Sequence, residues 1–291
     1  MKRKTGVILI IAAVIITGIT AALLLWNNSS FPDDFDTFIG MRNDLTTVLQ
    51  TEAEERKVNR FFEDYRLKLN PLFSFMFRDS ELKLHLTSYE SELIDTGSIS
   101  QFEIGDTGVF FDFTFMIRPD ENYSLPFFHG DALKALPGVD GALYMDFYAF
   151  AHSMSYEVFF GENISLIEEA RNLAKPYWKH EGFGELTVHL DDYKSPYRFE
   201  ILEPENATET ERLEYFETAR KCFNLYMEAY FNALNTQAGE PSSSDAERNI
   251  DSVEAFTEIL YKHDSAVKMG KMIFPEEDFD RYFLEGFWGV E

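Results

Sequence analysis

Residues 110–131 read FFDFTFMIRPDENYSLPFFHGD, and this stretch decides how the rest of the chain is interpreted. In its first half, apolar and mixed positions alternate with the period of two that a β-strand requires, so we expect a strand over 108–117. One face of that strand is wholly apolar and carries Phe111, Phe113, Phe115 and Ile117. The other face carries Phe110, Asp112, Thr114 and Met116. The first face therefore predicts a core, and the second is mixed enough to line a cleft.

Similar runs on both sides of this stretch predict a sheet. The expected strands cover 82–86, 99–104, 142–150 and, more briefly, 156–160, with weaker candidates at 186–190 and 197–202. Helical periodicity is found at 43–69, 165–177, 209–234, from 251 or 252 onward, and at 275–287. Helices before and after a sheet whose strands are joined by short turns favour an α/β fold, a three-layer α/β/α sandwich with a central, mostly antiparallel sheet. We expect one domain over 31–291.

The chain begins with a segment of a different kind, residues 1–30. Three basic residues at positions 2–4 precede an uncharged run over 6–26. That length suits a membrane-spanning helix of about 20 residues better than a signal-peptide core of about 7–15. Because a positive flank stays cytoplasmic, we expect a single-pass signal anchor with the body on the extracytoplasmic side. A cleaved signal peptide is the alternative.

Composition excludes several classes of function. The formal net charge is −25, and such an acidic surface repels phosphate backbones, so no nucleic-acid partner is expected. Cys222 is the only cysteine, which excludes an internal disulfide, a cysteine-ligated iron–sulfur cluster and a cysteine-based zinc site. The histidines show no metal-ligand spacing, and we expect neither a metal nor a bound cofactor. Electrons for a redox reaction would then come from an external one-electron donor.

A second unusual segment lies near the C-terminus. It contains, in order, Asp264, Phe274-Pro275-Glu276, Tyr282 and Phe287-Trp288. Together with Pro119 and the run 125–131, these residues resemble the ferredoxin-dependent bilin reductase family, which includes red chlorophyll catabolite reductase. In that family a strand leads through a proline into a Leu-Pro-x-Phe-Gly-x-Asp run, and a second aspartate begins the C-terminal block. The glycine of the run, Gly130, is displaced by one position here. The resemblance covers about 110–150 and 264–288.

This resemblance implies a linear tetrapyrrole held between the sheet and the C-terminal helices, facing two catalytic carboxyls, Asp131 and Asp264. It also implies ferredoxin as the electron-donor protein. Some members carry a catalytic histidine on the strand where this chain has Thr114, and His129 is a candidate to replace it. An arginine suits the propionates of a bilin because a guanidinium group binds a carboxylate in a fork. The residues expected to bind the substrate are Thr114, Arg118, Phe127, Phe128, His129, Asp146, Arg198 and His263.

The expected chemistry gives a reason for carboxyls of this kind. Electrons that arrive one at a time produce radicals, and each radical must be protonated by a positioned acid. A carboxyl desolvated by Phe127, Phe128 and an apolar ligand favours its neutral, proton-bearing form. We therefore predict stepwise electron and proton transfer to a double bond of the tetrapyrrole, with Asp131 and Asp264 as the acids.

Simpler roles exist for the same residues. Asp131 could be the N-cap of a helix that starts at Ala132, Asp264 could be an exposed helix residue, and Asp146 could pair with an arginine or with the backbone. An acidic body would also repel an acidic ferredoxin, so either the donor differs or the fold has lost its reaction. The alternatives to the reductase are a non-catalytic, membrane-anchored tetrapyrrole-binding or interaction module on the same fold, and a reductase of another small molecule that uses both aspartates.

Overall fold

The computed structural model describes residues 32–56, 65–66, 82–104, 111–134, 141–150, 153–178, 190, 193–239 and 242–290. The expected anchor at 1–30 lies outside these residues, as do Phe110 and most of the expected strand at 186–190. Within the described ranges, no helix combines the length and the apolar character needed to cross a membrane.

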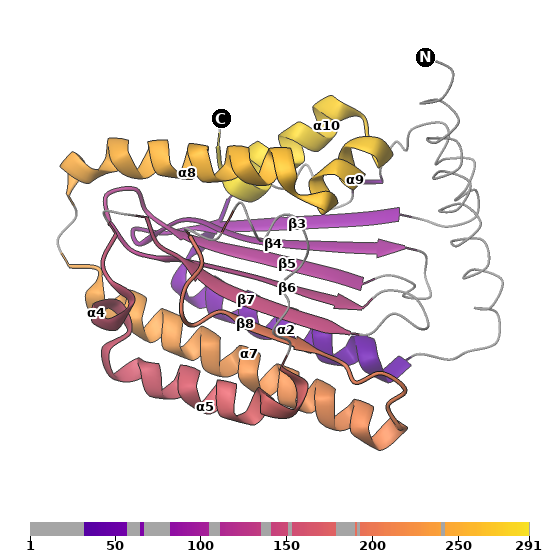
Figure 1. Cartoon of the computed structure of the whole chain (residues 1–291). Coiled ribbons are helices and arrows are strands. Elements are labelled where there is room, and N and C mark those ends of the chain that lie inside the picture. The colour runs from indigo at the N-terminus through magenta and orange to yellow at the C-terminus, as the bar shows by residue number, and fades with distance from the viewer. Residues whose placement is uncertain are drawn as a thin grey trace, which may run out of the picture.

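An antiparallel sheet forms the centre of the molecule (Figure 1). Seven of its eight strands follow the spatial order β1-β3-β4-β5-β6-β7-β8, and β2 pairs with β3 off this path. Neighbouring strands pair antiparallel throughout, which confirms the predicted sheet. The strands are β1 (Glu54–Glu55), β2 (Tyr65–Arg66), β3 (Leu82–Glu90), β4 (Ile94–Ile104), β5 (Phe111–Pro119), β6 (Phe127–Lys134), β7 (Ala142–Tyr148) and β8 (Phe199–Leu202).

Helices lie on both faces of this sheet, so the three expected layers are present (Figure 1). One face is covered by α2 (Pro32–Glu52), α4 (Tyr156–Phe160), η2 (Gly161–Asn163), α5 (Ile164–Ala174), η3 (Lys175–Tyr177) and the long helix α7 (Glu209–Gln237). The opposite face is covered by α8 (Ser243–His263), α9 (Ser265–Ile273), α10 (Glu276–Asp280) and the π-helix η4 (Arg281–Trp288).

The alternation along β5 distributes its side chains between the two faces as predicted. Phe113 and Phe115 are fully buried on the α7 side, where Phe223 contacts their rings edge-on with centroids 6.0 and 5.5 Å apart. Asp112 and Thr114 point to the other side and are half-buried. Burial of each large apolar side chain contributes about 1.5–3 kcal/mol. The α7 face therefore holds the sheet together, and the face under the C-terminal helices is left to carry polar groups.

A second apolar cluster attaches the C-terminal helices to that polar face. Met116 of β5 and Phe127 of β6 pack there with Phe256 of α8 and with Trp288 of η4. The Phe256 and Trp288 rings meet edge-on, with centroids 5.6 Å apart. Trp288 is only 1% exposed, so the end of η4 is part of the protein interior and fixes the position of the helix above the strands.

The displaced glycine of the 125–131 run has a structural explanation. Gly130 lies within β6, opposite Phe115 on β5. A Cβ atom at this position would lie 2.4 Å from Cε1 of Phe115 and 2.9 Å from the carbonyl oxygen of Tyr144. The Phe115 ring therefore lies across the backbone of β6, and only glycine leaves room for it.

Two local predictions are wrong. The expected strand at Tyr156–Phe160 is helix α4, because Ser155 accepts a hydrogen bond from the N–H of Val158 and acts as its N-cap. No helix starts at Ala132 either: β6 continues through this residue, which pairs with Phe113 on β5. Asp131 is consequently a mid-strand residue and not an N-cap.

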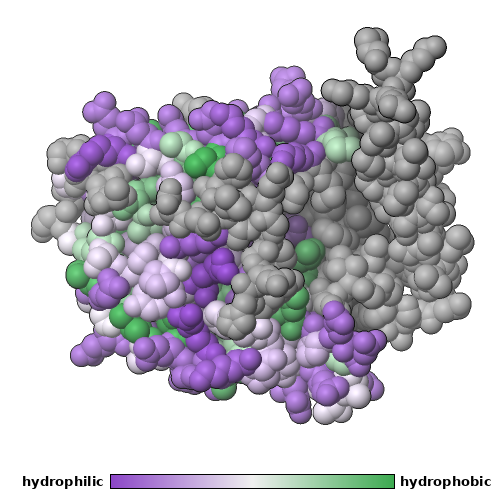
Figure 2. All heavy atoms as spheres, viewed as in Figure 1, coloured by the Kyte–Doolittle hydropathy of each residue, from purple (hydrophilic) through white to green (hydrophobic). Residues whose placement is uncertain are grey.

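Hydrophilic side chains cover most of the described surface in the view of Figure 2, with hydrophobic side chains in smaller groups. The 51 acidic residues of the chain account for much of this character. The exposed large hydrophobic residues are scattered over separate elements, which is normal for a protein surface. Among the described residues they are Val158, Leu213, Ile250 and Met272.

Candidate active site

Asp112 and Asp131 form a carboxyl pair on the polar face of the sheet. Thr114 lies directly opposite Asp131 in the register of β5 and β6. Its Oγ1 is 3.2 Å from Oδ1 of Asp131 and 3.3 Å from Oδ1 of Asp112, and the two carboxyls also hydrogen-bond to each other. A hydrogen bond between two carboxyls requires a proton on one of them. The sheet thus builds a pair that holds at least one proton.

Burial raises the pKa of both members of the pair. The pKa of Asp131 lies well above its usual range because burial disfavours the charged form, and the Asp112 carboxyl raises it further. For Asp112, burial raises the pKa most, hydrogen bonds with Asp131 and Thr114 lower it, and the charge of Asp264 raises it. Because both side chains are only half-buried, protons can still be exchanged with solvent. Burial therefore favours the proton-bearing form of the pair, which is the form that a general acid requires.

The C-terminal helices place Tyr282 and Asp264 close to this pair. Tyr282 of η4 hydrogen-bonds to the hydroxyl of Ser100, which lies opposite Thr114 on the neighbouring strand β4. Burial raises the pKa of the Tyr282 phenol, and the charges of Asp112 and Asp131 raise it further. Asp264 is the residue at which α8 ends, with φ −66° and ψ 130°. It is half-buried rather than an exposed helix residue, and its charge acts on Asp112.

His129 lies on the same face of β6 as Asp131, and the end of η4 packs over it. Its imidazole is stacked on the Trp288 indole, with ring centroids 6.1 Å apart and planes inclined by 20°. Burial lowers the pKa of His129 to about 4. Within the described part of the chain its Nδ1 has no hydrogen-bond partner. The imidazole is therefore neutral at physiological pH, and a role as the acid that replaces the missing strand histidine is not supported.

Asp146 has a structural environment of its own on β7. Its Oδ1 accepts hydrogen bonds from the Ser195 hydroxyl at 2.5 Å and from the Phe147 N–H at 2.8 Å, and its Oδ2 accepts one from the Tyr144 hydroxyl at 3.2 Å. The Tyr144 hydroxyl is also 2.9 Å from that of Tyr148. Burial raises the pKa of Asp146 to about 7, against the lowering effect of these hydrogen bonds. The residue pairs with backbone and hydroxyl groups, as one of the sequence alternatives proposed.

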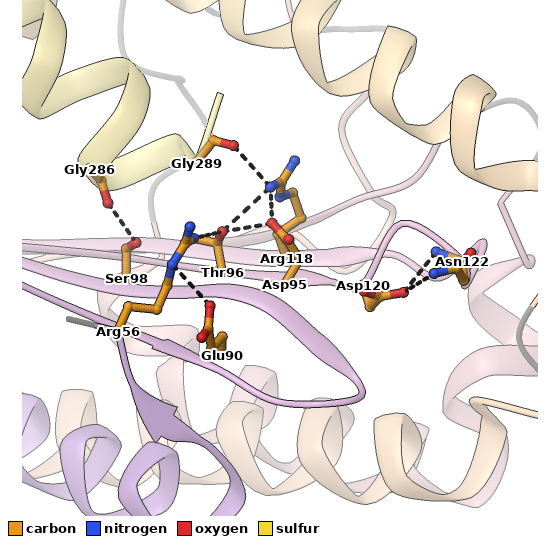
Figure 3. A network of polar contacts seen from close by, with 10 residues as sticks. All are labelled: Arg56, Glu90, Asp95, Thr96, Ser98, Arg118, Asp120, Asn122, Gly286 and Gly289. Carbon is orange, nitrogen blue, oxygen red and sulfur yellow. Dashed lines mark hydrogen bonds and ion pairs between the residues drawn. The ribbon is translucent and has the colours of Figure 1, made fainter. Parts of the chain in front are cut away.

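Arg118 is part of a network that ties the chain beyond η4 to the sheet (Figure 3). Its guanidinium group is ion-paired with Asp95, donates to the hydroxyl of Thr96 at 3.4 Å, and donates to the carbonyl oxygen of Gly289 at 3.3 Å. Arg56 donates to the same Thr96 hydroxyl at 3.0 Å. Burial lowers the pKa of Arg118 to about 10. The Arg118 contacts are all made by its Nη2, and its binding of a propionate stays a prediction.

Of three further predicted substrate-binding residues, Phe128 lies apart from the carboxyl pair. Phe128 points to the opposite face of the sheet, where it packs against Tyr230 of α7 with ring centroids 5.2 Å apart. It cannot contact a ligand above Asp131, because neighbouring residues of a strand point to opposite faces. Arg198, just before β8, is 3.8 Å from Glu200. His263 is half-buried at the end of α8, next to Asp264.

The structure brings together Asp131, Asp264 and Thr114, and it adds three groups that the sequence did not assign to the site, Asp112, Ser100 and Tyr282. Asp112 was seen as a member of the mixed face of its strand, and its position two residues from Thr114 was the available signal. Ser100 gave no signal of its own, because its partner Tyr282 is 182 positions away in the sequence. Among the described residues, no group of three or more histidine, cysteine and carboxylate side chains could hold a metal ion.

Comparison with known proteins gives one informative result. The sequence matches no family model and no curated protein. The fold, however, is similar to that of phytochromobilin synthase from tomato, a ferredoxin-dependent bilin reductase whose crystal structure was determined in complex with biliverdin. The TM-score is 0.63 at 12% sequence identity, and the similarity covers 86% of this chain and 82% of that chain. The fold resemblance that the sequence indicates is therefore confirmed.

Proposed function

We propose that this protein is an oxidoreductase that reduces a linear tetrapyrrole by stepwise transfer of electrons and protons. The observation that carries the proposal is the buried carboxyl pair of Asp112 and Asp131, which Thr114 bridges beneath the C-terminal helices, with Asp264 close by. The similarity to a fold that holds biliverdin in the tomato enzyme supports the substrate class.

In this proposal Asp131 is the acid that protonates the pigment after an electron has arrived. Reduction of one double bond consumes two electrons and two protons, and the product carries two new C–H bonds. The raised pKa of Asp131 favours its protonated carboxyl, which can supply a proton when the radical forms. Asp264 faces the same pair from the end of α8 and is the second acid.

Binding of the flat pigment requires an apolar wall and a cation for its propionates. Phe127 supplies part of that wall, because it lies on the same face of β6 as Asp131 and meets Phe150 edge-on at 5.1 Å. Arg198 is half-buried near the edge of the sheet, and we propose that it binds one propionate, since Nη2 of Arg118 is ion-paired with Asp95.

The electron donor is an external one-electron carrier, and ferredoxin is the donor that the fold relationship suggests. A net charge of −25 disfavours an acidic partner. We therefore propose a donor with a basic docking face, which meets the protein on the extracytoplasmic side if residues 1–30 form the anchor.

The decisive experiment adds biliverdin to the full chain in mild detergent and records the absorption spectrum before and after addition of a photochemical reductant. We expect the pigment to bind, its long-wavelength band to shift as reduction proceeds, and Asp131→Asn to slow that shift by about 10²–10⁴-fold. Asp251→Asn, an exposed carboxyl on α8, is the matched control.

Two other results would redirect the interpretation. A pigment that binds but is not reduced by wild type would favour a non-catalytic tetrapyrrole-binding module on this fold. The deep burial of Trp288 over His129 is the observation that favours such a module, because it closes part of the polar face. If biliverdin and related bilins do not bind, both tetrapyrrole interpretations fail.

A further inference from the structure

The Thr114 hydroxyl lies between the two carboxyls of the pair and can connect them by hydrogen bonds. Its single hydroxyl proton can be donated to only one carboxyl at a time, yet Oγ1 lies 3.2 Å from Asp131 and 3.3 Å from Asp112. When both carboxyls are protonated, the hydroxyl can accept a hydrogen bond from one carboxyl and donate one to the other in either of two directions, and one of these directions suits proton transfer to a ligand. In this direction the Asp112 O–H donates to Thr114 Oγ1, and the Thr114 O–H donates to Asp131.

In that arrangement Thr114 does not use the Asp131 proton, and a bound ligand can compete with the Asp112 carboxyl for it. After Asp131 has lost it, the Thr114 hydroxyl can pass its own proton to the Asp131 carboxylate and take another from Asp112. No heavy atom has to move for this step, since both oxygen–oxygen contacts already exist. The two aspartates thus differ in role although they have the same chemistry.

The groups that surround the pair favour the protonated state. Tyr282 of η4 faces the carboxyl pair and is neutral. Asp264 faces the pair from the end of α8 with a negative charge. His263 precedes Asp264, and the Nζ of Lys268 on α9 lies 3.2 Å from the His263 carbonyl oxygen. On β4 the facing side chain is the neutral Ser100. Neither Tyr282 nor Asp264, the two groups that act on the pair from the C-terminal helices, carries a positive charge, and this disfavours two ionised carboxylates side by side.

We propose that Asp112 stores the second proton of each two-electron reduction and delivers it through the Thr114 hydroxyl to Asp131. This role rests on the proposed reductase function. The first electron forms a pigment radical anion, and Asp131 protonates it. Transfer from Asp112 through Thr114 then restores the Asp131 proton, the second electron arrives, and Asp131 protonates the resulting carbanion. The pair ends as two carboxylates, and solvent returns two protons.

The test compares single-turnover reductions of bound biliverdin by the full-length wild type, Asp112→Asn, Thr114→Val and Thr114→Ser. In Asp112→Asn and Thr114→Val we expect the first protonation to stay within about threefold of wild type and the second to slow by on the order of 10²-fold. The radical intermediate would then persist in the electron spin resonance signal. Thr114→Ser keeps the hydroxyl and should restore the wild-type rate. The rate of the slow second protonation should also depend on pH, because in these variants the proton comes from solvent and not from Asp112.

A merely structural role of Asp112 would slow both protonations equally or weaken pigment binding, and either result would overturn the relay. A second protonation that stays as fast as in wild type in Thr114→Val would also overturn the relay. Infrared difference spectra between wild type and Asp112→Asn without pigment test the pair independently of the substrate. A protonated carboxyl signal near neutral pH that is lost in Asp112→Asn supports the proton store even if biliverdin does not bind, whereas its absence at pH 6 refutes the store whatever the substrate is.

Discussion

The His129 imidazole lies against the Trp288 indole, with ring planes inclined by only 20°, so a residue of the central sheet and the last residue of η4 share one buried contact. This contact joins the run 125–131 to the C-terminal block, which are the two segments that carry the family resemblance in the sequence. Its energetic consequence concerns the stability of the fold in acid rather than proton transfer to a ligand.

Protonation of His129 should limit stability below neutral pH. In the unfolded chain this group takes up a proton near its ordinary pKa of about 6.5, whereas in the folded protein it does so only near 4. The unfolded state therefore binds more protons in this window, and stability falls as the pH falls from 6.5 to 4. We expect His129→Gln to reduce that loss by on the order of 1–3 kcal/mol in urea unfolding at pH 4.5, 5.5 and 6.5. Parallel stability curves for variant and wild type would contradict this assignment.

Asp146 should act in the opposite direction. Its folded pKa is raised to about 7, so the folded protein keeps a proton that the unfolded chain releases near pH 4, and stability falls as the pH rises from 4 to 7. Asp146→Asn keeps the Ser195 contact possible and removes the titration. We predict that the free energy of unfolding of wild type, relative to this variant, drops by on the order of 2–4 kcal/mol between pH 4.5 and 8. A difference that does not change with pH would show that Asp146 is ionised throughout.

Even the small substitution Gly289→Ala should lower the free energy of unfolding. It has φ +64°, and a Cβ atom there would lie 2.5 Å from Thr96 Oγ1 and 3.1 Å from Arg118 Nη2. Gly239→Ala is the matched control, because Gly239 has the same φ of +64° but only a carbonyl oxygen 3.8 Å away. Both variants pay the left-handed backbone penalty of about 1–2 kcal/mol. We expect Gly289→Ala to cost at least about 1 kcal/mol more in urea unfolding, and equal costs would mean that the Arg118 network adjusts freely.

Gly130→Ala should be more damaging than the corresponding change at Gly97. At Gly130 the new Cβ would meet the ring of Phe115 and the Tyr144 carbonyl oxygen, which packed neighbours prevent from moving. At Gly97 it would meet the tip of the Leu49 side chain at 2.9 Å, which can change rotamer. We predict a loss of about 3 kcal/mol or more at Gly130 and about 1 kcal/mol at Gly97, measured by denaturant unfolding. A similar loss at the two sites would show that Phe115 has room to rotate.

The sequence predicted those parts of the fold that depend on local patterns. Alternation in β5 placed Phe113 in the core and Asp112 on the polar face, and the apolar spacing of 209–234 predicted most of α7. Strand β6 was missed because Pro126, Gly130 and two adjacent phenylalanines obscure the period of two. Its position in the sheet results from pairing with β5 and β7, which is a tertiary effect.

The candidate site was predicted in part for the same reason. Asp131, Asp264 and Thr114 lie in segments with unusual sequences, so they could be named from the sequence. Tyr282 and Ser100 meet only because the C-terminal helices fold back over β4, and no local pattern records that return. Phe128 was assigned to the wrong face because β6 had not been recognised as a strand.

The division of β5 and β6 into an apolar and a polar face has an evolutionary consequence. Substitutions at Asp112, Thr114 or Asp131 change groups outside the core beneath α7, so they can be sampled at little risk to folding. New reactivity could arise in a lineage by drift on one side of the strands while the other side preserves the scaffold. The fold similarity to the tomato enzyme at 12% sequence identity shows that such a scaffold can be built from very different sequences.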